Sequence, residues 1–465
     1  MSQRVRARGE GRRRGGIDPK RLAVLGALER KVLWLACWTI HNANHVRPSR
    51  DGLKVGGHQA SCASVATLMT ALYFDVLRPN DRVAVKPHAS PVFHAIRYLL
   101  GKESRERLER FRALGGAQAY PSRTKDAGGV DFSTGSVGLG VAMTLFASLT
   151  QDLIRLQEPE AEHGPEGRMV AIVGDAELDE GNVWEALLEG WKHDVRNLWW
   201  VIDYNRQSLD RVVPERLWSK IEDFFTAVGW NVVTIKYGKR LQAAFRRPGG
   251  GELRRWIDAC PNDLYSALTF KGGPAWREHL ELDLGHVPGM RELLADHDDD
   301  ALARLMTNLG GHDLEAVLEA FRAADGDDRP HCFLAYTIKG FGLPFAGHKD
   351  NHAGLMTPEQ MARFRAAHAV PEGREWDPFA GLDDPRPEEL RAFLADVPFA
   401  ERHEVRPSAR VAVPAALPRG RTGARGSTQE AFGRIMAELA RDGGELSGRI
   451  VTASPDVTVS TSLGG

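Results

Sequence analysis

The sequence has few cysteines, almost no net charge and no long apolar run. Four cysteines occur among 465 residues and none forms a CxxC pair, so neither a disulfide framework nor a zinc ribbon is expected. The 61 basic residues nearly balance the 62 acidic ones, which gives no electrostatic case for nucleic acid or an anionic membrane as a partner. The longest apolar run, VLWLACWTI, is too short to span a bilayer. We therefore expect a soluble, cytoplasmic protein that binds neither nucleic acid nor membrane.

Strand and helix patterns alternate through most of the chain. RMVAIVGD and NLWWVIDYN have the apolar runs of buried strands, and the helical pattern NVWEALLEGWKH lies between them. This alternation predicts an α/β fold with a doubly wound, mostly parallel sheet. The Arg-rich residues 1–20 are expected to form a disordered basic tail, and residues 21–370 the α/β domain.

The last hundred residues differ in composition. Residues 371–426 are rich in Pro, Arg, Ala and Asp, which favours a linker. Beyond them, STQEAFGRIMAELARD predicts a helix and RIVTASPDV a strand. One helix and one strand cannot complete a sheet domain. We therefore expect residues 427–465 to be the truncated start of a second, similar domain.

Two oxygen donors end neighbouring predicted strands. Asp175 follows the first strand and Asn205 the second, 30 positions later. Ligands of doubly wound sheets bind at the carboxyl ends of the strands, and carboxylate, amide and backbone carbonyl oxygens suit Mg²⁺ shared with a diphosphate. The alternative is that Asp175 caps the following helix and Asn205 occupies a turn.

With EG after the first strand and NL before the second, this segment resembles the thiamine diphosphate enzymes of the transketolase superfamily, whose signature is GDG, about thirty residues and then N. The resemblance implies the thiamine diphosphate-binding fold, with Mg²⁺ held by Asp175, Asn205 and the backbone carbonyl of Gln207. Ala176 replaces the second Gly of the signature, and its Cβ is tolerated only where φ is negative; otherwise cofactor affinity is weakened.

Further segments agree with the resemblance. TGSVGLG resembles the TGxLGxG turn of the superfamily, although helix packing alone also explains such a turn. The residues that the resemblance assigns to cofactor binding are Ser61, Val137, Gly138, Gly174, Asp175, Ala176, Glu177, Asn205, Gln207 and Lys339. It further implies that Glu180 is a catalytic carboxylate in a network at a subunit interface.

Three histidines are candidate catalytic residues. His58 in GGHQAS and His88 in KPHASP lie in loops before helices, where an imidazole can donate to a substrate carbonyl or take up a proton. These motifs resemble GGHxAS and GHxSP of the homodimeric pyruvate dehydrogenase decarboxylases, although single histidines are more often structural. His352, in GHKDNHAGLM, is placed by the resemblance on a mobile loop at the mouth of the site. The absence of HExxH makes a zinc hydrolase an unfavoured alternative.

Three functions stay open from the sequence. The first is thiamine diphosphate- and Mg²⁺-dependent decarboxylation of a pyruvate-like 2-oxo acid, with acyl transfer to the lipoyl groups of an acyltransferase. The second is transketolase activity on sugar phosphates, which the GHKDNHAGLM loop favours. The third is a non-catalytic cofactor-binding remnant or subunit, which Ala176 favours. We expect a homodimer or a complementing subunit that carries the rest of the pyrimidine-binding domain, and an inactive chain on its own.

Overall fold

The structure of the protein is a computed structural model. It describes residues 16–49, 52–157, 165–208, 211–212, 217–401, 411–418, 425–454 and 457–464. The chain divides into two compact units, Met1–Arg402 and His403–Gly465. Each unit is described by itself.

The first unit is built on a five-stranded sheet in which every neighbouring pair is parallel. The strand order is β1 (Arg82–Ala84), β2 (Met169–Gly174), β3 (Leu198–Tyr204), β7 (His331–Tyr336) and β6 (Asn231–Ile235). All residues of β2, β3 and β7 are buried, which explains why these strands read as continuous apolar runs. The predicted doubly wound α/β fold is confirmed.

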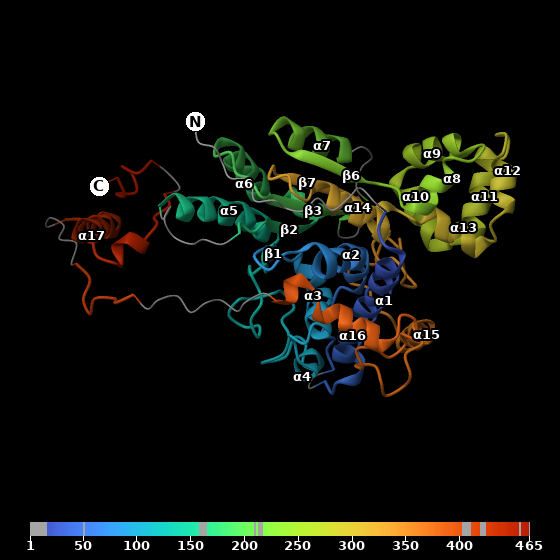
Figure 1. Cartoon of the computed structure of the whole chain (residues 1–465), viewed down its shortest axis with the longest axis horizontal. Helices are drawn as coiled ribbons and strands as arrows, with labels where there is room; N and C mark the ends of the chain where they lie inside the picture. The colour runs from blue at the N-terminus through green and yellow to red at the C-terminus, as the bar shows by residue number, and fades with distance from the viewer. Residues whose placement is uncertain are drawn as a thin grey trace. The chain divides into compact units, whose positions relative to one another are not determined.

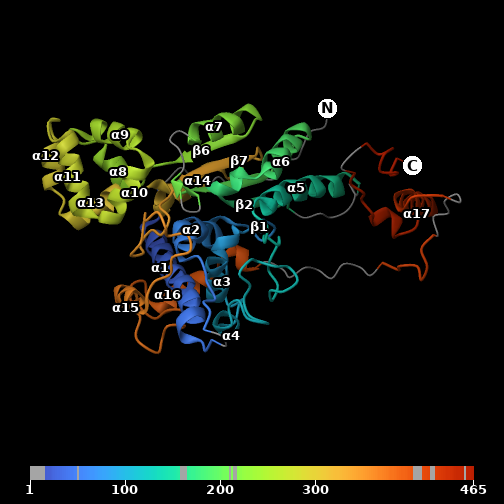
Figure 2. The same ribbon diagram turned by 180° about the vertical axis from the view of Figure 1, so that it is seen from behind.

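Helices cover both faces of this sheet, as Figure 1 and the reverse view in Figure 2 show. One face packs against α5 (Leu139–Gln157), α6 (Gly181–Lys192) and α7 (Leu217–Ala227). The other packs against α1 (Pro19–His41), α2 (Gln59–Ala71), α3 (Ser90–Leu99) and α14 (Leu314–Ala324). Successive strand residues point to opposite faces of the sheet. Ile172 packs in the core with α1, α2, α3 and α14, whereas Val173 packs in the core with α5, α6 and α7.

A cluster of helices is inserted between β6 and β7. It contains α8 (Lys239–Ala244), α9 (Gly250–Ala259), α10 (Asn262–Lys271), α11 (Gly273–Leu284), α12 (Met290–Ala295) and α13 (Asp299–Met306). Trp276 and Tyr265 are buried in it, with ring centroids 5.0 Å apart.

The remaining elements of this unit are η1 (Asn42–Val46), η2 (Leu72–Val76), η3 (Pro87–Ala89), α4 (Arg105–Glu109), η4 (Asp175–Asp179), β4 (Gln207–Ser208), β5 (Arg211–Val212), η5 (Gly310–His312), α15 (Pro358–Ala367), α16 (Pro387–Ala395) and η6 (Pro398–Glu401).

By length and composition, α5 is the one helix of the described residues that could cross a membrane. Core helices of soluble proteins pass the same test. Here α5 packs against β1, β2 and α6, as expected of a helix that covers a doubly wound sheet.

The boundaries of the first unit differ from the predicted ones. Ile17 is buried, and the Asp18 side chain accepts a hydrogen bond from the Lys20 amide at the start of α1. The folded unit thus begins within the predicted tail of residues 1–20, whose residues 1–15 lie outside the described part. A helix cap and a buried Ile act on single positions, which the Arg-rich composition does not reveal.

The predicted linker, residues 371–426, is also wrong over its first part. Trp376 and Leu390 are buried against α1, and the Trp34 indole donates to the Glu375 carbonyl at 2.8 Å. The segment therefore folds with the first unit through the described residues up to 401. Its Pro-rich composition hides the few apolar side chains that fix it in place.

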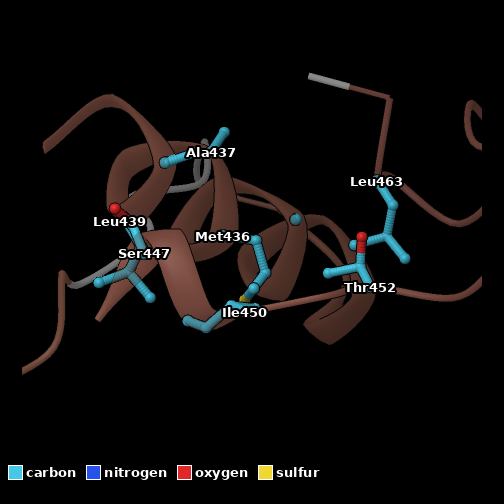
Figure 3. Close-up of a pocket in the computed structure, with 9 residues that line it drawn as sticks. Met436, Ala437, Leu439, Ser447, Ile450, Thr452 and Leu463 are labelled. Carbon is cyan, nitrogen blue, oxygen red and sulfur yellow. The ribbon is translucent and has the colours of Figure 1, made fainter. Parts of the chain in front are cut away.

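The second unit contains α17 (Thr428–Asp442) and η7 (Ser447–Arg449). The predicted strand RIVTASPDV does not form in its described residues, because a strand needs a neighbour to pair with. A small pocket of about 140 Å³ lies in this unit, and Figure 3 shows residues that line it. It is lined by apolar side chains such as Met436 and Ile450 together with the hydroxyl residues Ser447 and Thr452, and by no titratable side chain.

Candidate functional site

Asp175 lies where β2 ends, level with the end of β3 because Gly174 pairs with Asp203. Its Oδ1 accepts the Ala176 amide at 3.0 Å and its Oδ2 the Arg206 amide at 2.7 Å. Burial, and then the nearby Asp203 carboxylate, raise the pKa of Asp175 to about 7. A buried carboxylate with a raised pKa is one that a bound cation would stabilise.

The residues after β3 complete this edge. Asn205 is buried, and its Nδ2 donates to Asp203 Oδ2 at 3.2 Å, which directs the amide oxygen away from Asp203. Arg206 adopts φ 64°, a strained conformation for a residue with a side chain, and its amide donates to Asp175. Gln207 follows directly and pairs with Val212 in the β4–β5 hairpin. The carboxylate, amide and backbone carbonyl oxygens at this edge are ligands that a hard cation prefers.

The backbone at Ala176 has room for its side chain, because φ there is not positive. It lies in the 3₁₀ helix η4 and is not among the described non-glycine residues with positive φ. An alanine is therefore accommodated without backbone strain at this position of the signature.

The Gly-rich turn is joined to the same edge through Glu177. This buried carboxylate accepts the Gly174 amide at Oε1 and the Gly138 amide at Oε2, both at 3.0 Å. Gly138 has φ 76°, and a Cβ placed there would lie 2.8 Å from the Cβ of Glu180. Val137 before it is exposed, as is Glu180 at the start of α6. The turn thus presents backbone at the start of α5, where an anion is favoured.

The three expected histidines form one cluster. The ring centroids of His58 and His88 are 3.9 Å apart, and His352 lies 5.0 Å from the first ring and 5.2 Å from the second. Nitrogen atoms of all three lie within 4.8 Å of one another. Side chains from residues 58, 88 and 352 therefore meet although the sequence separates them widely.

Hydrogen bonds assign different roles to two of these rings. His58 Nδ1 lies 3.1 Å from the His352 carbonyl and donates to it, so its Nε2 is left as an acceptor. The Lys339 ammonium lies 3.0 Å from His352 Nδ1 and donates to it, so His352 carries its proton on Nε2. The cluster thus holds one acceptor and one donor. The proton on His352 Nε2 opposes ligation of a metal by all three rings.

Residues 55–246 match the family model for "Transketolase, thiamine diphosphate binding domain". This interval contains the Gly-rich turn, Asp175, Asn205 and two of the three histidines. The chain belongs to the thiamine diphosphate-dependent transketolase superfamily.

Relatives of the superfamily match most of this chain. The pyruvate dehydrogenase E1 component of Cupriavidus necator is 30% identical over 332 residues, which are 68% of this chain and 36% of that protein. The one of Corynebacterium glutamicum is 28% identical over 465 residues, 92% of this chain and 48% of that protein. The chain thus spans less than half the length of these relatives.

Solved structures show the same fold. The transketolase of Leishmania mexicana has a TM-score of 0.54 at 17% identity, covering 80% of this chain and 44% of the transketolase. The transketolase of Campylobacter jejuni has the same TM-score and identity, with 81% and 46% covered. Such likeness shows the superfamily fold alone.

Two histidines of the cluster in this superfamily member, His58 and His88, have lowered pKa values. Burial, followed by the neighbouring His58 and Lys86, lowers the pKa of His88 to about 2. Burial also lowers the pKa of His58, and the positive charges of Arg112, Lys339 and Lys86 lower it further. Neutral imidazoles among cations suit hydrogen bonding to an anionic substrate rather than storage of positive charge.

The charges of Lys86 and Lys339 act on both halves of the site. They lower the pKa of His88 and limit the rise in the pKa of Asp175. Lys339 contacts His352 at 3.0 Å, and Lys86, two residues before His88, contacts Asp203 at 2.7 Å, so the histidine cluster and the Asp175 edge adjoin. Ser61 lies buried in the first turn of α2, with its carbonyl 3.2 Å from the Ser64 hydroxyl. The structure therefore brings the expected residues together at one edge of the sheet; the side chain of Gln207 lies outside the described part.

A buried network around Asp203 was not predicted from the sequence. This carboxylate accepts from Lys86 Nζ at 2.7 Å, the Ser64 hydroxyl at 2.6 Å, Asn205 and the Thr337 hydroxyl. Lys86 in KPHASP stands directly before the Pro-His of a motif that was singled out, and Asp203 lies two residues before Asn205. A charged residue at the end of an apolar strand was the available signal.

A larger cavity of about 820 Å³ lies elsewhere, at the β6 edge of the sheet. Lys236, Tyr237, Arg254 and Asp258 are among the residues that line it. None of the expected site residues does. The candidate site is therefore identified by the residues that meet at the carboxyl ends of β2 and β3, and not by the volume of a cavity.

Proposed function

We propose that this chain binds thiamine diphosphate through a divalent metal ion at the carboxyl edge of its sheet, and that it provides the diphosphate-binding part of an enzyme. The observation that carries this is the meeting of Asp175, Asn205 and the Gly138 turn beside the histidine cluster. Asp175, Asn205 and the Gln207 carbonyl are the proposed Mg²⁺ ligands, all of them hard oxygen donors.

The residues of the chain have separable tasks in this proposal. Bound thiamine diphosphate supplies the carbon nucleophile and the electron sink. His352 offers an Nε2 proton to a substrate oxygen, and His58 offers an Nε2 lone pair. Lys339 holds the donor tautomer of His352, and the buried surroundings of His88 keep that ring neutral. Glu180 is proposed for the subunit interface.

The proposed substrate is a 2-oxo acid such as pyruvate, with acyl transfer to a lipoyl group. Two observations support this class: the motifs around His58 and His88, and the relatives named as pyruvate dehydrogenase E1 components. The cations around the histidines also favour a carboxylate. Ketol transfer between sugar phosphates is the second candidate, because the loop before His352 has the transketolase form. We propose a homodimer or a complementing subunit as the assembly.

Calorimetry tests the cofactor site. Thiamine diphosphate is titrated into the protein with Mg²⁺ and, separately, with a chelator, using the parent chain, Asp175→Ala and the control Asp179→Ala. Asp179 is exposed in the same 3₁₀ helix. We expect binding only with metal and its loss in Asp175→Ala alone. Binding that resists the chelator, or that survives Asp175→Ala, contradicts the proposed site.

Turnover tests the substrate. Release of carbon dioxide from pyruvate is compared with aldose-dependent consumption of a ketose phosphate, for the chain alone and with any polypeptide encoded directly downstream. The downstream polypeptide is included because the relatives are more than twice as long as the matched part. Carbon dioxide release supports the decarboxylase proposal. Ketol transfer without decarboxylation favours the transketolase alternative instead.

A further inference from the structure

A buried lysine lies at the centre of the diphosphate edge. Lys86 follows β1, is 7% exposed, and its Nζ contacts Asp203 Oδ2 at 2.7 Å. Burial disfavours the ammonium, yet Asp203, and after it Asp175 and Glu177, outweigh this and raise the pKa of Lys86. Lys86 is therefore a permanent positive charge among three carboxylates.

Asp203 does not depend on the Lys86 ammonium alone for its hydrogen bonds. Asp203 also accepts from the neutral groups of Ser64, Asn205 and Thr337. A carboxylate has about four acceptor positions, so these neutral donors already satisfy most of them. What Lys86 adds to Asp203 is charge.

The backbone leaves room for this charge beside the metal ligand. A Cβ on Gly174, the residue before Asp175, would lie 3.0 Å from Lys86 Cε and 3.3 Å from its Nζ. Gly174 also donates its amide to Glu177, the carboxylate that holds the Gly138 turn. Lys86 thus lies beside the residues proposed for the metal and for the diphosphate.

We propose that Lys86 is a built-in cation of the cofactor site, which weakens divalent-metal binding at Asp175 and strengthens binding of the diphosphate, with Asp203 as its positioning residue. This inference rests on the proposed function. A fixed positive charge repels a dication and attracts a polyanion. Loss of Lys86 therefore moves the two affinities in opposite directions. An ion pair that only supports the fold would move them together or not at all.

The test uses Mn²⁺ as a spectroscopic probe of the metal site. Free Mn²⁺ is measured by electron paramagnetic resonance, and thiamine diphosphate is titrated by calorimetry at saturating Mn²⁺. For Lys86→Met we expect Mn²⁺ to bind about tenfold more tightly and thiamine diphosphate about tenfold more weakly. Lys86→Arg, which keeps the charge but changes the shape of the side chain, is the control, and its two constants are expected not to move in opposite directions.

A second pair of variants keeps the test decisive if Lys86→Met does not fold. Asp203→Asn makes the site more positive, so Mn²⁺ is expected to bind more weakly and the diphosphate more tightly. Lys86→Met with Asp203→Asn removes both charges, and its Mn²⁺ affinity is expected to return toward the parent value. Shifts of both ligands in one direction, or no shifts, overturn the inference. A parent chain that binds neither ligand overturns the proposed function instead.

Discussion

Replacing Gly138 by alanine is expected to weaken thiamine diphosphate binding, because position 138 of the turn has no room for a side chain. Gly138 has φ 76°, and an added Cβ would lie 2.8 Å from both the Cβ of Glu180 and Oδ1 of Asn182. Its amide also donates to Glu177, which connects the turn to the end of β2. A shift of the turn would therefore disturb the proposed diphosphate site directly.

The size of the effect follows from two contributions. An L-residue in the left-handed region costs roughly 1–2 kcal/mol, and forcing a methyl group into a packed position costs about 1–3 kcal/mol more. Even about 2 kcal/mol, if it appears wholly as lost binding, weakens the affinity about thirtyfold. Gly135 in the same turn is the matched control, because its Cβ would meet nothing within 4 Å and its φ lies outside the strained region.

Calorimetry with Mg²⁺ and thermal unfolding without cofactor are measured on the parent, Gly138→Ala and Gly135→Ala. We expect the parent and Gly135→Ala to agree closely and Gly138→Ala to bind much more weakly. Equal affinities for the two alanine variants would show that the turn does not approach the diphosphate. A large loss of thermal stability with unchanged affinity would assign Gly138 to the fold alone.

Three further predictions follow from single features. Ala176→Gly is expected to lower the unfolding free energy by about 0.4–1 kcal/mol without tighter cofactor binding by calorimetry, since Ala176 is unstrained; tighter binding would show that its Cβ obstructs the diphosphate. Burial lowers the pKa of His312 from 6.5 to about 3, so its neutral form contributes stability above pH 6.5 that is lost as pH falls toward 3. In urea unfolding, His312→Gln is expected to lack this loss of about 1.4 kcal/mol per pH unit, and an unchanged slope would contradict it. Phe146 and Ile154 are exposed on α5, and changing both to Asp is expected to dissociate the proposed dimer in sedimentation experiments, whereas an unaltered dimer would place the interface elsewhere.

The sheet and the convergence at its edge were predictable from local patterns. RMVAIVGD and NLWWVIDYN are apolar runs bounded by polar residues, and one helix fits between them, which leaves a parallel pair as the natural arrangement. Once the strands are parallel, Asp175 and Asn205 must end at the same edge. The histidine cluster, in contrast, was predicted from a resemblance, because no periodicity relates position 352 to positions 58 and 88.

Errors arose where a few contacts override composition. The Pro-rich segment after residue 371 reads as a linker, yet Trp376 and Leu390 bind it to α1. RIVTASPDV has strand composition, but strand formation depends on a partner strand that composition cannot supply. Lys86 was missed for a related reason: its partner Asp203 is 117 residues away in sequence.

The charges of the candidate site act on both of its parts, the Asp175 edge and the histidine cluster. The Asp175 edge holds the carboxylates of Asp175, Glu177 and Asp203, whereas the adjoining cluster holds His58 and His88, whose pKa values are lowered. Lys86 and Lys339 act on both regions, because they limit the rise in the pKa of Asp175 and lower the pKa of His88. A metal ion bound at Asp175 would add positive charge on the same side and oppose protonation of the histidines further. Metal binding at Asp175 would therefore favour the neutral form of the histidine rings, which the proposed proton donor and acceptor require.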